Sequence, residues 1–317
     1  MDIILYFVLG AAVGSWIAAR KIGNKAIFLG GFCALVPSVD AVVSLFLPTS
    51  QAIFVSGGYT HSIVFCALLA PIVGWLFHKI CKFNSSIVRL SFLAFFCMIS
   101  HCVIDVLSIS GAGILEPFSH KRYALPVLAD IDWFCLCVMS VAFLLAYIVR
   151  DGRHKSMISW SGIFIMAIYI SFAFLNKLSV QSLFEQNLKD QDIRYSRAEV
   201  FPVSGSMLMW NCVAQDRDGF WMSYQSNFSK NNFELNLLLR NDYYLFEHES
   251  VTDIKNVEAY TKNYYIVESK SDSVVFIRDL RYARVGLRST DEFRNSFEVN
   301  FLKQSVEIQQ NNHYWVE

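Results

Sequence analysis

The sequence predicts a membrane α-helical bundle with six transmembrane helices, followed by a β-rich domain outside the membrane. Three observations lead to this fold class. Of the 317 residues, 54% are hydrophobic and only 17% are charged, whereas a soluble domain carries about 25% charged residues. Long apolar runs fill residues 1–176, where only 11 basic and 7 acidic residues occur. Residues 177–317 hold the other 16 basic and 20 acidic residues and have an ordinary soluble composition.

Six apolar segments approach the roughly 20 residues that a helix needs to cross a bilayer. We expect these spans at residues 3–19, 26–47, 62–77, 87–107, 131–149 and 157–176. The second segment contains Pro37, and a proline frees backbone carbonyls that can then face a cavity. The polar stretch 177–195 predicts a helix that links the last span to the β-rich domain.

Basic residues alternate along the connections between these segments. Nine follow the first, third and fifth segments, and two lie in the other connections. The nine are Arg20, Lys21, Lys25, Lys79, Lys82, Arg89, Arg150, Arg153 and Lys155, and the two are Lys121 and Arg122. By the positive-inside rule, both termini then lie outside the cytoplasm. In a bacterium this predicts an inner-membrane protein with a periplasmic C-terminal domain.

Residues 196–317 form the predicted β-rich domain. Short runs of β-branched or aromatic residues, bounded by turn residues, predict strands. These runs lie at 206–215, 219–226, 263–269, 273–279 and 297–302. The chain has no net charge and shows no basic stripe, so nucleic acid is not an expected partner.

Acidic residues within the apolar half point to the function. A carboxylate inside a hydrocarbon span is costly, so it usually faces a cavity, a partner or a metal. In the predicted topology, four carboxylates and two imidazoles fall at the outer end of the bundle. They are Asp40, Asp105, Asp130, Asp132, His61 and His101.

His101 and Asp105 are the sharpest pair, because residues four apart share one face of a helix. They suit two ligands of one metal ion, or a buried hydrogen bond that locks two helices. His61, within Thr60-His61-Ser62, is either a further ligand or a bystander next to a helix N-cap. Asp40, which follows Pro37, is either a ligand or a residue that stabilises a kink.

Asp130 and Asp132 precede the fifth segment, where negative charge favours a helix N-terminus. Because they are two residues apart and face different ways, we expect Asp132 to bind metal, with Asp130 as cap or catalytic base. Arg122 is either a solvated side chain or a contact to a substrate phosphate. The predicted metal ligands are therefore Asp40, His61, His101, Asp105 and Asp132, and the predicted catalytic residues are Asp130 and Arg122.

In this order and spacing, the residues resemble the YdjM-type inner-membrane metal-dependent hydrolases, a family similar to the zinc-dependent phospholipase C and nuclease group. The matching elements are Pro37-x-x-Asp40, Thr60-His61-Ser62, His101-x-x-x-Asp105 with Gly111, Pro117-Phe118-Ser119 with Arg122, Ile131-Asp132, Trp210 and Asp279-Leu280-Arg281-Tyr282. Three positions depart from the family pattern. Where the family often has an aspartate and a His-Arg pair, this chain has Ser38, Ser56 and Gly57, which favours a site with fewer ions.

Together, the residues and the resemblance predict a membrane-embedded, divalent-metal-dependent hydrolase. Its expected substrate is a phosphoester of a membrane lipid or another amphiphile at the outer leaflet. Zinc is the expected metal, with manganese or magnesium as alternatives, since mixed imidazole and carboxylate ligands suit all three. A non-catalytic metal-binding or transport protein remains an alternative, as does a helix-locking network whose outer domain binds a protein partner.

Overall fold

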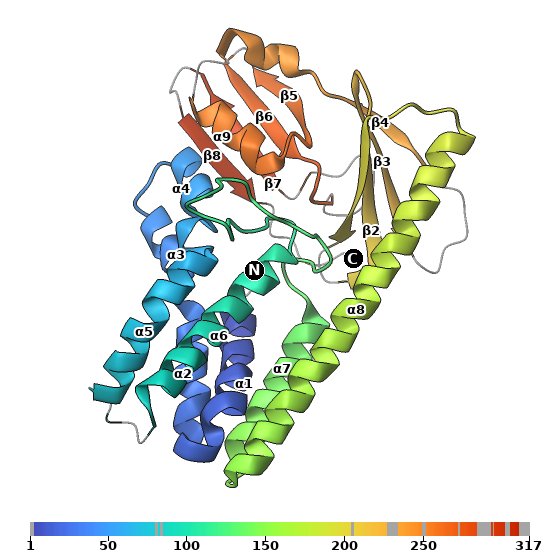
Figure 1. Cartoon of the computed structure of the whole chain (residues 1–317). Helices are drawn as coiled ribbons and strands as arrows, with labels where there is room; N and C mark the ends of the chain where they lie inside the picture. Colours follow the sequence, from blue (N-terminus) through green and yellow to red (C-terminus); the bar gives the residue numbers. More distant parts are fainter. Residues whose placement is uncertain are drawn as a thin grey trace. The chain divides into compact units, whose positions relative to one another are not determined.

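The computed structural model describes residues 3–79, 82, 85–203, 206–226, 234–248, 252–271, 273–283, 293, 295–301 and 305–310. The chain divides into two compact units. One comprises Met1–Val42 and Ser56–Ala173, and the other comprises Val43–Val55 and Phe174–Glu317. Figure 1 shows that the first unit is helical and that the second contains the β-strands.

The helical unit is built around α1 (Ile3–Ile22), which packs against the helices α2, α6 and α7, whose bounds follow (Figure 1). The other helices are α2 (Asn24–Leu35), α5 (Ile63–Lys79), α6 (Ile87–Val106), α7 (Trp133–Ile148) and α8 (Gly152–Asp190), which continues into the second unit. Glycines bring α1 close to α2, because a Cβ on Gly14 would lie 2.7 Å from the Cα of Gly30. Small residues that let two helix backbones approach this closely are typical of helices that pack within membranes.

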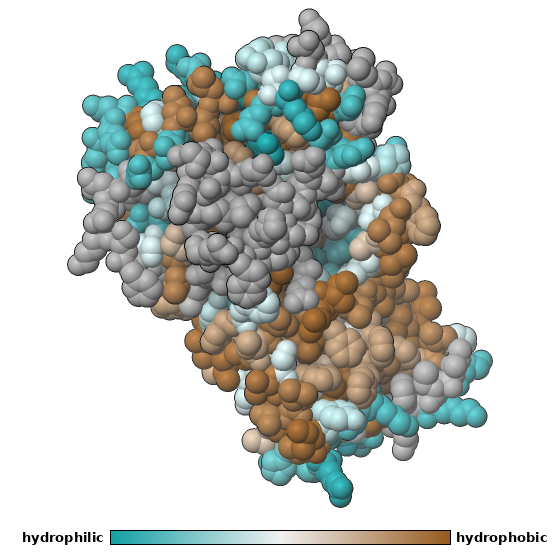
Figure 2. Space-filling model, turned by 180° about the vertical axis from the view of Figure 1, so that it is seen from behind, coloured by the Kyte–Doolittle hydropathy of each residue, from teal (hydrophilic) through white to brown (hydrophobic). Residues whose placement is uncertain are grey.

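The predicted membrane-spanning helices are confirmed in part. Among the described residues, α1, α6 and α8 are long and apolar enough to cross a membrane, whereas α2, α5 and α7 are shorter apolar helices. Large apolar side chains on these helices are exposed, among them Phe92, Val141 and Phe164, each more than half accessible. Figure 2 shows this hydrophobic surface over the helical unit. Such a surface suits contact with lipid chains rather than with water.

The segment predicted as a second span, 26–47, is not one helix. α2 ends at Leu35, and the chain turns before the short helices α3 (Val39–Ser44) and α4 (Thr49–Val55). Pro37 lies in this turn, and its missing N–H cannot continue the backbone ladder of α2. The turn places Asp40 in the first turn of α3. Later in the sequence, the predicted sixth span and the predicted linking helix form one continuous helix, α8.

The connection between α6 and α7 folds back on the segment before α5. Gly113 donates its backbone N–H to the Gly57 carbonyl oxygen at 2.8 Å, and Ala112 pairs with Tyr123. Gly111 has a φ of +68°, and a Cβ there would lie 2.6 Å from the Tyr123 carbonyl oxygen. Glycine is therefore required at this turn.

The predicted β-rich domain is confirmed as two four-stranded antiparallel sheets. In the first sheet, the order is β1 (Arg197–Val203), β2 (Ser206–Gln215), β3 (Gly219–Ser226) and β4 (Asn236–Leu239). In the second, it is β5 (Tyr265–Ser271), β6 (Val274–Asp279), β7 (Asn295–Asn300) and β8 (Ser305–Gln310). Phe184 of α8 packs with Trp210 of the first sheet, and Val257 of α9 (Thr252–Thr261) packs with the second.

Candidate metal centre

His101 is held by α6 with one ring nitrogen already committed. The side chain is 1% exposed, and its Nδ1 lies 2.7 Å from the Ala34 carbonyl oxygen. That carbonyl is available because α2 ends at Leu35 and leaves its last carbonyls without helical partners. Since a carbonyl can only accept, Nδ1 carries a proton and donates it to Ala34, and Nε2 remains available to the other residues of the site.

His61 presents its Nε2 in the same way from a different segment. It ends the short helix η1 (Tyr59–His61) and is 4% exposed. Its Nδ1 lies 3.2 Å from Oδ2 of Asp40, which also accepts the Gly57 backbone N–H at 2.6 Å. Because a carboxylate accepts, Nδ1 of His61 carries a proton, and its Nε2 faces Asp105 and His101.

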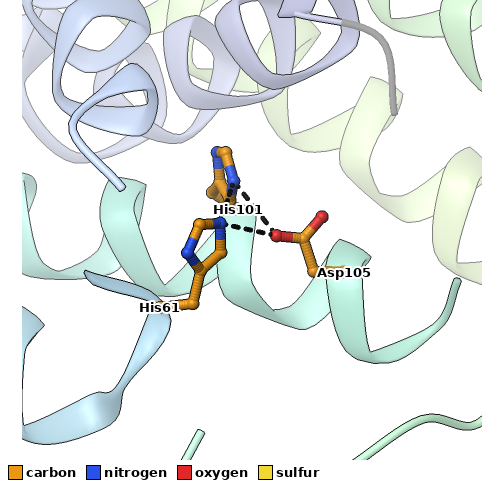
Figure 3. A group of neighbouring side chains, drawn as sticks. All are labelled: His61, His101 and Asp105. Atoms are coloured by element: carbon orange, nitrogen blue, oxygen red, sulfur yellow. Dashed lines mark hydrogen bonds and ion pairs between the residues drawn. The ribbon is translucent and has the colours of Figure 1, made fainter. Parts of the chain in front are cut away.

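Asp105 completes a group of three electron-pair donors. Its Oδ2 lies 2.9 Å from Nε2 of His61 and 3.1 Å from Nε2 of His101, and the two nitrogens are 3.1 Å apart. Figure 3 shows the three side chains converging, with His101 and Asp105 on one helix. Such a contact is made either by a proton that Nε2 donates to the carboxylate or by a cation that lies between the three atoms.

The spacing of these atoms fits a metal ion. Ligand atoms about 2.1 Å from one ion are about 3.0 Å apart in octahedral geometry and about 3.4 Å apart in tetrahedral geometry. The observed separations of 2.9–3.1 Å match the first value more closely. Two imidazoles and one carboxylate on adjacent coordination positions of one ion are an established ligand set for first-row divalent metals. His61, His101 and Asp105 therefore form a group suited to a metal ion.

Tyr6 of α1 belongs to this site, although the sequence analysis did not identify it. Its hydroxyl donates a hydrogen bond to Oδ1 of Asp105. Its ring stacks on the His101 imidazole, with centroids 3.6 Å apart and planes inclined by 19°. A tyrosine in an apolar helix is common near membrane interfaces, so the sequence contains no signal that would separate this one from the others.

Asp40 lies behind His61 rather than beside its Nε2. Its contacts to Nδ1 of His61 and to the Gly57 N–H place it outside the three-atom group. This arrangement is that of a carboxylate which orients a metal-binding histidine and raises its basicity. Ser56 and Gly57, where the family pattern has polar side chains, instead contribute main-chain atoms: the Ser56 carbonyl accepts from Arg122, and the Gly57 N–H binds Asp40.

The Asp40→Asn variant should bind a divalent metal about 10- to 100-fold more weakly than the wild type, which is the usual cost of losing such a second partner. Competition with a chromophoric chelator on the purified protein measures this change. The Asp151→Asn variant serves as the control, because Asp151 is exposed and pairs with the exposed His154. An unchanged affinity in Asp40→Asn would contradict the orienting role.

Asp132, rather than Asp130, occupies the N-cap position of α7. Asp132 caps α7 by accepting the Cys135 backbone N–H at 3.0 Å, and its other oxygen accepts the Tyr169 hydroxyl at 2.6 Å. Both of its oxygens thus serve helix packing, and Asp132 lies outside the three-atom group. Asp130 is half-buried and lies close enough to act electrostatically on Tyr6.

The chain is similar to known inner membrane proteins. The family model described as YdjM inner membrane protein matches residues 1–180. Inner membrane protein YbcI of Escherichia coli (strain K12) is 25% identical over 126 residues, which cover 39% of this chain and 72% of that protein. No solved structure matches the chain significantly. Because the matched region exceeds half of the chain and includes His61, His101 and Asp105, the chain belongs to the YdjM family of inner membrane proteins.

Proposed function

We propose that the protein is a membrane-embedded, divalent-metal-dependent hydrolase that cleaves a phosphoester of a lipid or another amphiphile at the outer leaflet of the inner membrane. One observation carries the proposal. Three buried side-chain atoms, Nε2 of His61, Nε2 of His101 and Oδ2 of Asp105, converge to within 2.9–3.1 Å of one another. Two imidazoles and one carboxylate at this separation are a ligand set for a divalent metal ion, which would take the place of the protons that otherwise join these atoms.

A divalent ion at such a site polarises a phosphoryl group and activates water. The residues of the chain would divide the remaining tasks. His61, His101 and Asp105 would hold the ion, while Asp40 would fix the ring of His61. Arg122 donates to the Ser56 carbonyl, next to Gly57, and is the proposed contact for a substrate phosphate. Asp130 is the proposed base, because its carboxylate lies close enough to the site to act electrostatically on Tyr6.

The proposed substrate follows from the position of the site along its helix. His101 and Asp105 lie in the last two turns of α6, which ends at Val106. The distribution of basic residues assigns this end of α6 to the outer side of the membrane, which also favours a periplasmic second unit. Phe118 and Tyr59, in the connections near this end, are 84% and 57% exposed. Exposed aromatic rings suit the level of the lipid headgroups.

Hydrolysis of phospholipid vesicles by the purified protein tests the proposal. Vesicles of phosphatidylethanolamine and phosphatidylglycerol, with zinc, manganese or magnesium added in turn, should yield products that mass spectrometry detects. A chelator should abolish the reaction, and Arg122→Ala should slow it. Stoichiometric metal without hydrolysis would instead favour the non-catalytic metal-binding alternative, and absence of metal would favour a helix-locking network.

A further inference from the structure

The two carboxylate oxygens of Asp105 have different partners, and one of these partners is the hydroxyl of Tyr6. Oδ1 accepts the hydrogen bond from Tyr6, whereas Oδ2 faces Nε2 of both histidines at 2.9 and 3.1 Å. Asp105 is 6% exposed and Tyr6 is 5% exposed, so water does not readily replace the tyrosine. A carboxylate held in this way offers an ion one oxygen rather than two.

The ring of Tyr6 also restricts His101. The imidazole is fixed at one edge by the Ala34 carbonyl oxygen and at one face by the stacked phenol ring. Rotation of the imidazole would break the hydrogen bond to Ala34 and lose the stacking contact. One residue of α1 therefore contacts two members of the three-atom group at once.

We propose that Tyr6 is a positioning residue of the metal centre, which keeps Asp105 a one-oxygen ligand and holds the His101 ring in the orientation that binds the ion. This inference rests on the proposed metal binding by His61, His101 and Asp105. Without the hydroxyl, Oδ1 of Asp105 loses its partner in a buried site, and the carboxylate is free to turn both oxygens toward the ion. Metal affinity and the mode of carboxylate binding then depend on a residue that does not touch the ion.

The Tyr6→Phe variant tests this role, because it removes the hydroxyl and keeps the stacked ring. We expect its affinity for zinc, measured by competition with a chromophoric chelator, to fall about 10- to 100-fold. Tyr169→Phe is the matched control. Tyr169 is also a buried tyrosine whose hydroxyl binds an aspartate, at 2.6 Å from Asp132, but outside the three-atom group. Its loss should lower the thermal stability and leave the zinc affinity unchanged.

Infrared difference spectra of the wild-type protein, metal-loaded minus metal-free, provide a measurement that needs no variant. The separation of the two carboxylate stretching bands distinguishes binding through one oxygen from binding through two. The one-oxygen pattern is expected in the wild type, and a change toward the two-oxygen pattern is expected in Tyr6→Phe.

The outcomes separate this inference from the function on which it rests. A wild-type protein without bound metal would remove the proposed function. Bound metal in the wild type with equal zinc affinities in Tyr6→Phe and Tyr169→Phe, or a two-oxygen pattern in the wild type, would overturn the role of Tyr6 alone.

Discussion

His101→Ala should lower the metal content of the purified protein from stoichiometric to background. The variant removes one of three donor atoms and leaves two that are 2.9 Å apart, Nε2 of His61 and Oδ2 of Asp105. Loss of an orienting partner alone costs about 10- to 100-fold in affinity, and loss of a ligand should cost more than that. Elemental analysis of wild type and variant after equal dialysis measures the difference.

Two further variants make the His101 result interpretable. His154→Ala removes an exposed histidine that pairs with Asp151 at the start of α8, and it should keep the full metal content. His101→Asn retains an amide donor at the position of Nδ1 for the Ala34 carbonyl oxygen, so it separates loss of the ion from loss of the contact between α6 and α2. Full metal content in His101→Ala would contradict the metal centre. In that case, a shared proton rather than a metal ion would lie between the three atoms.

Arg281→Met should destabilise the second unit by about 3–5 kcal/mol. Arg281 and Asp279 are both fully buried, and the guanidinium donates to both carboxylate oxygens at 2.9 and 2.7 Å. Burial lowers the pKa of Arg281, but the charge and hydrogen bonds of Asp279, together with Tyr282 and Tyr260, raise it above its usual value, so the guanidinium stays charged. Without Arg281, the Asp279 charge would remain buried and unpaired. Hydrogen exchange in β5 and β6 of the full chain measures the effect.

The control for Arg281 is an ion pair on the surface of the same sheet. Lys270 is 53% exposed and lies 3.3 Å from Glu298, so Lys270→Met should cost at most about 1 kcal/mol. The double variant Asp279→Leu with Arg281→Met should recover much of the stability, because it leaves no isolated buried charge. Equal exchange rates in Arg281→Met and Lys270→Met would contradict the structural role of the buried pair.

Hydropathy along the sequence does not show where one apolar helix ends and the next begins. Residues 26–47 read as one apolar span, yet the chain turns at Pro37 and continues in the short helix α3. Val39 and Val42 of α3 are more than half exposed, so the apolar pattern continues past the turn even though the helix does not. An apolar side chain contributes equally to such a pattern whether its backbone continues a helix or begins another.

The strands show the same limit. β2 and β3 have the predicted bounds, because the turn residues 216–218 separate two long runs with aromatic members. β4 was not predicted, since it has four residues and its Leu237 and Leu239 are exposed. A short edge strand has too few residues to show a clear alternation of apolar and polar side chains. Whether it forms depends on its pairing with a neighbouring strand.

For the metal centre, the sequence by itself determined the types of ligand and the shared helix face of His101 and Asp105, because helical periodicity is a local property. Only the tertiary structure decided which other groups meet them. It brought His61 to their side, placed Tyr6 on Asp105, and left Asp40 behind the His61 ring. It also engaged Asp132 with Tyr169 rather than with the histidines. These contacts depend on how separate segments pack and on which carbonyl is free at a helix end. The spacing of residues along one segment predicts neither.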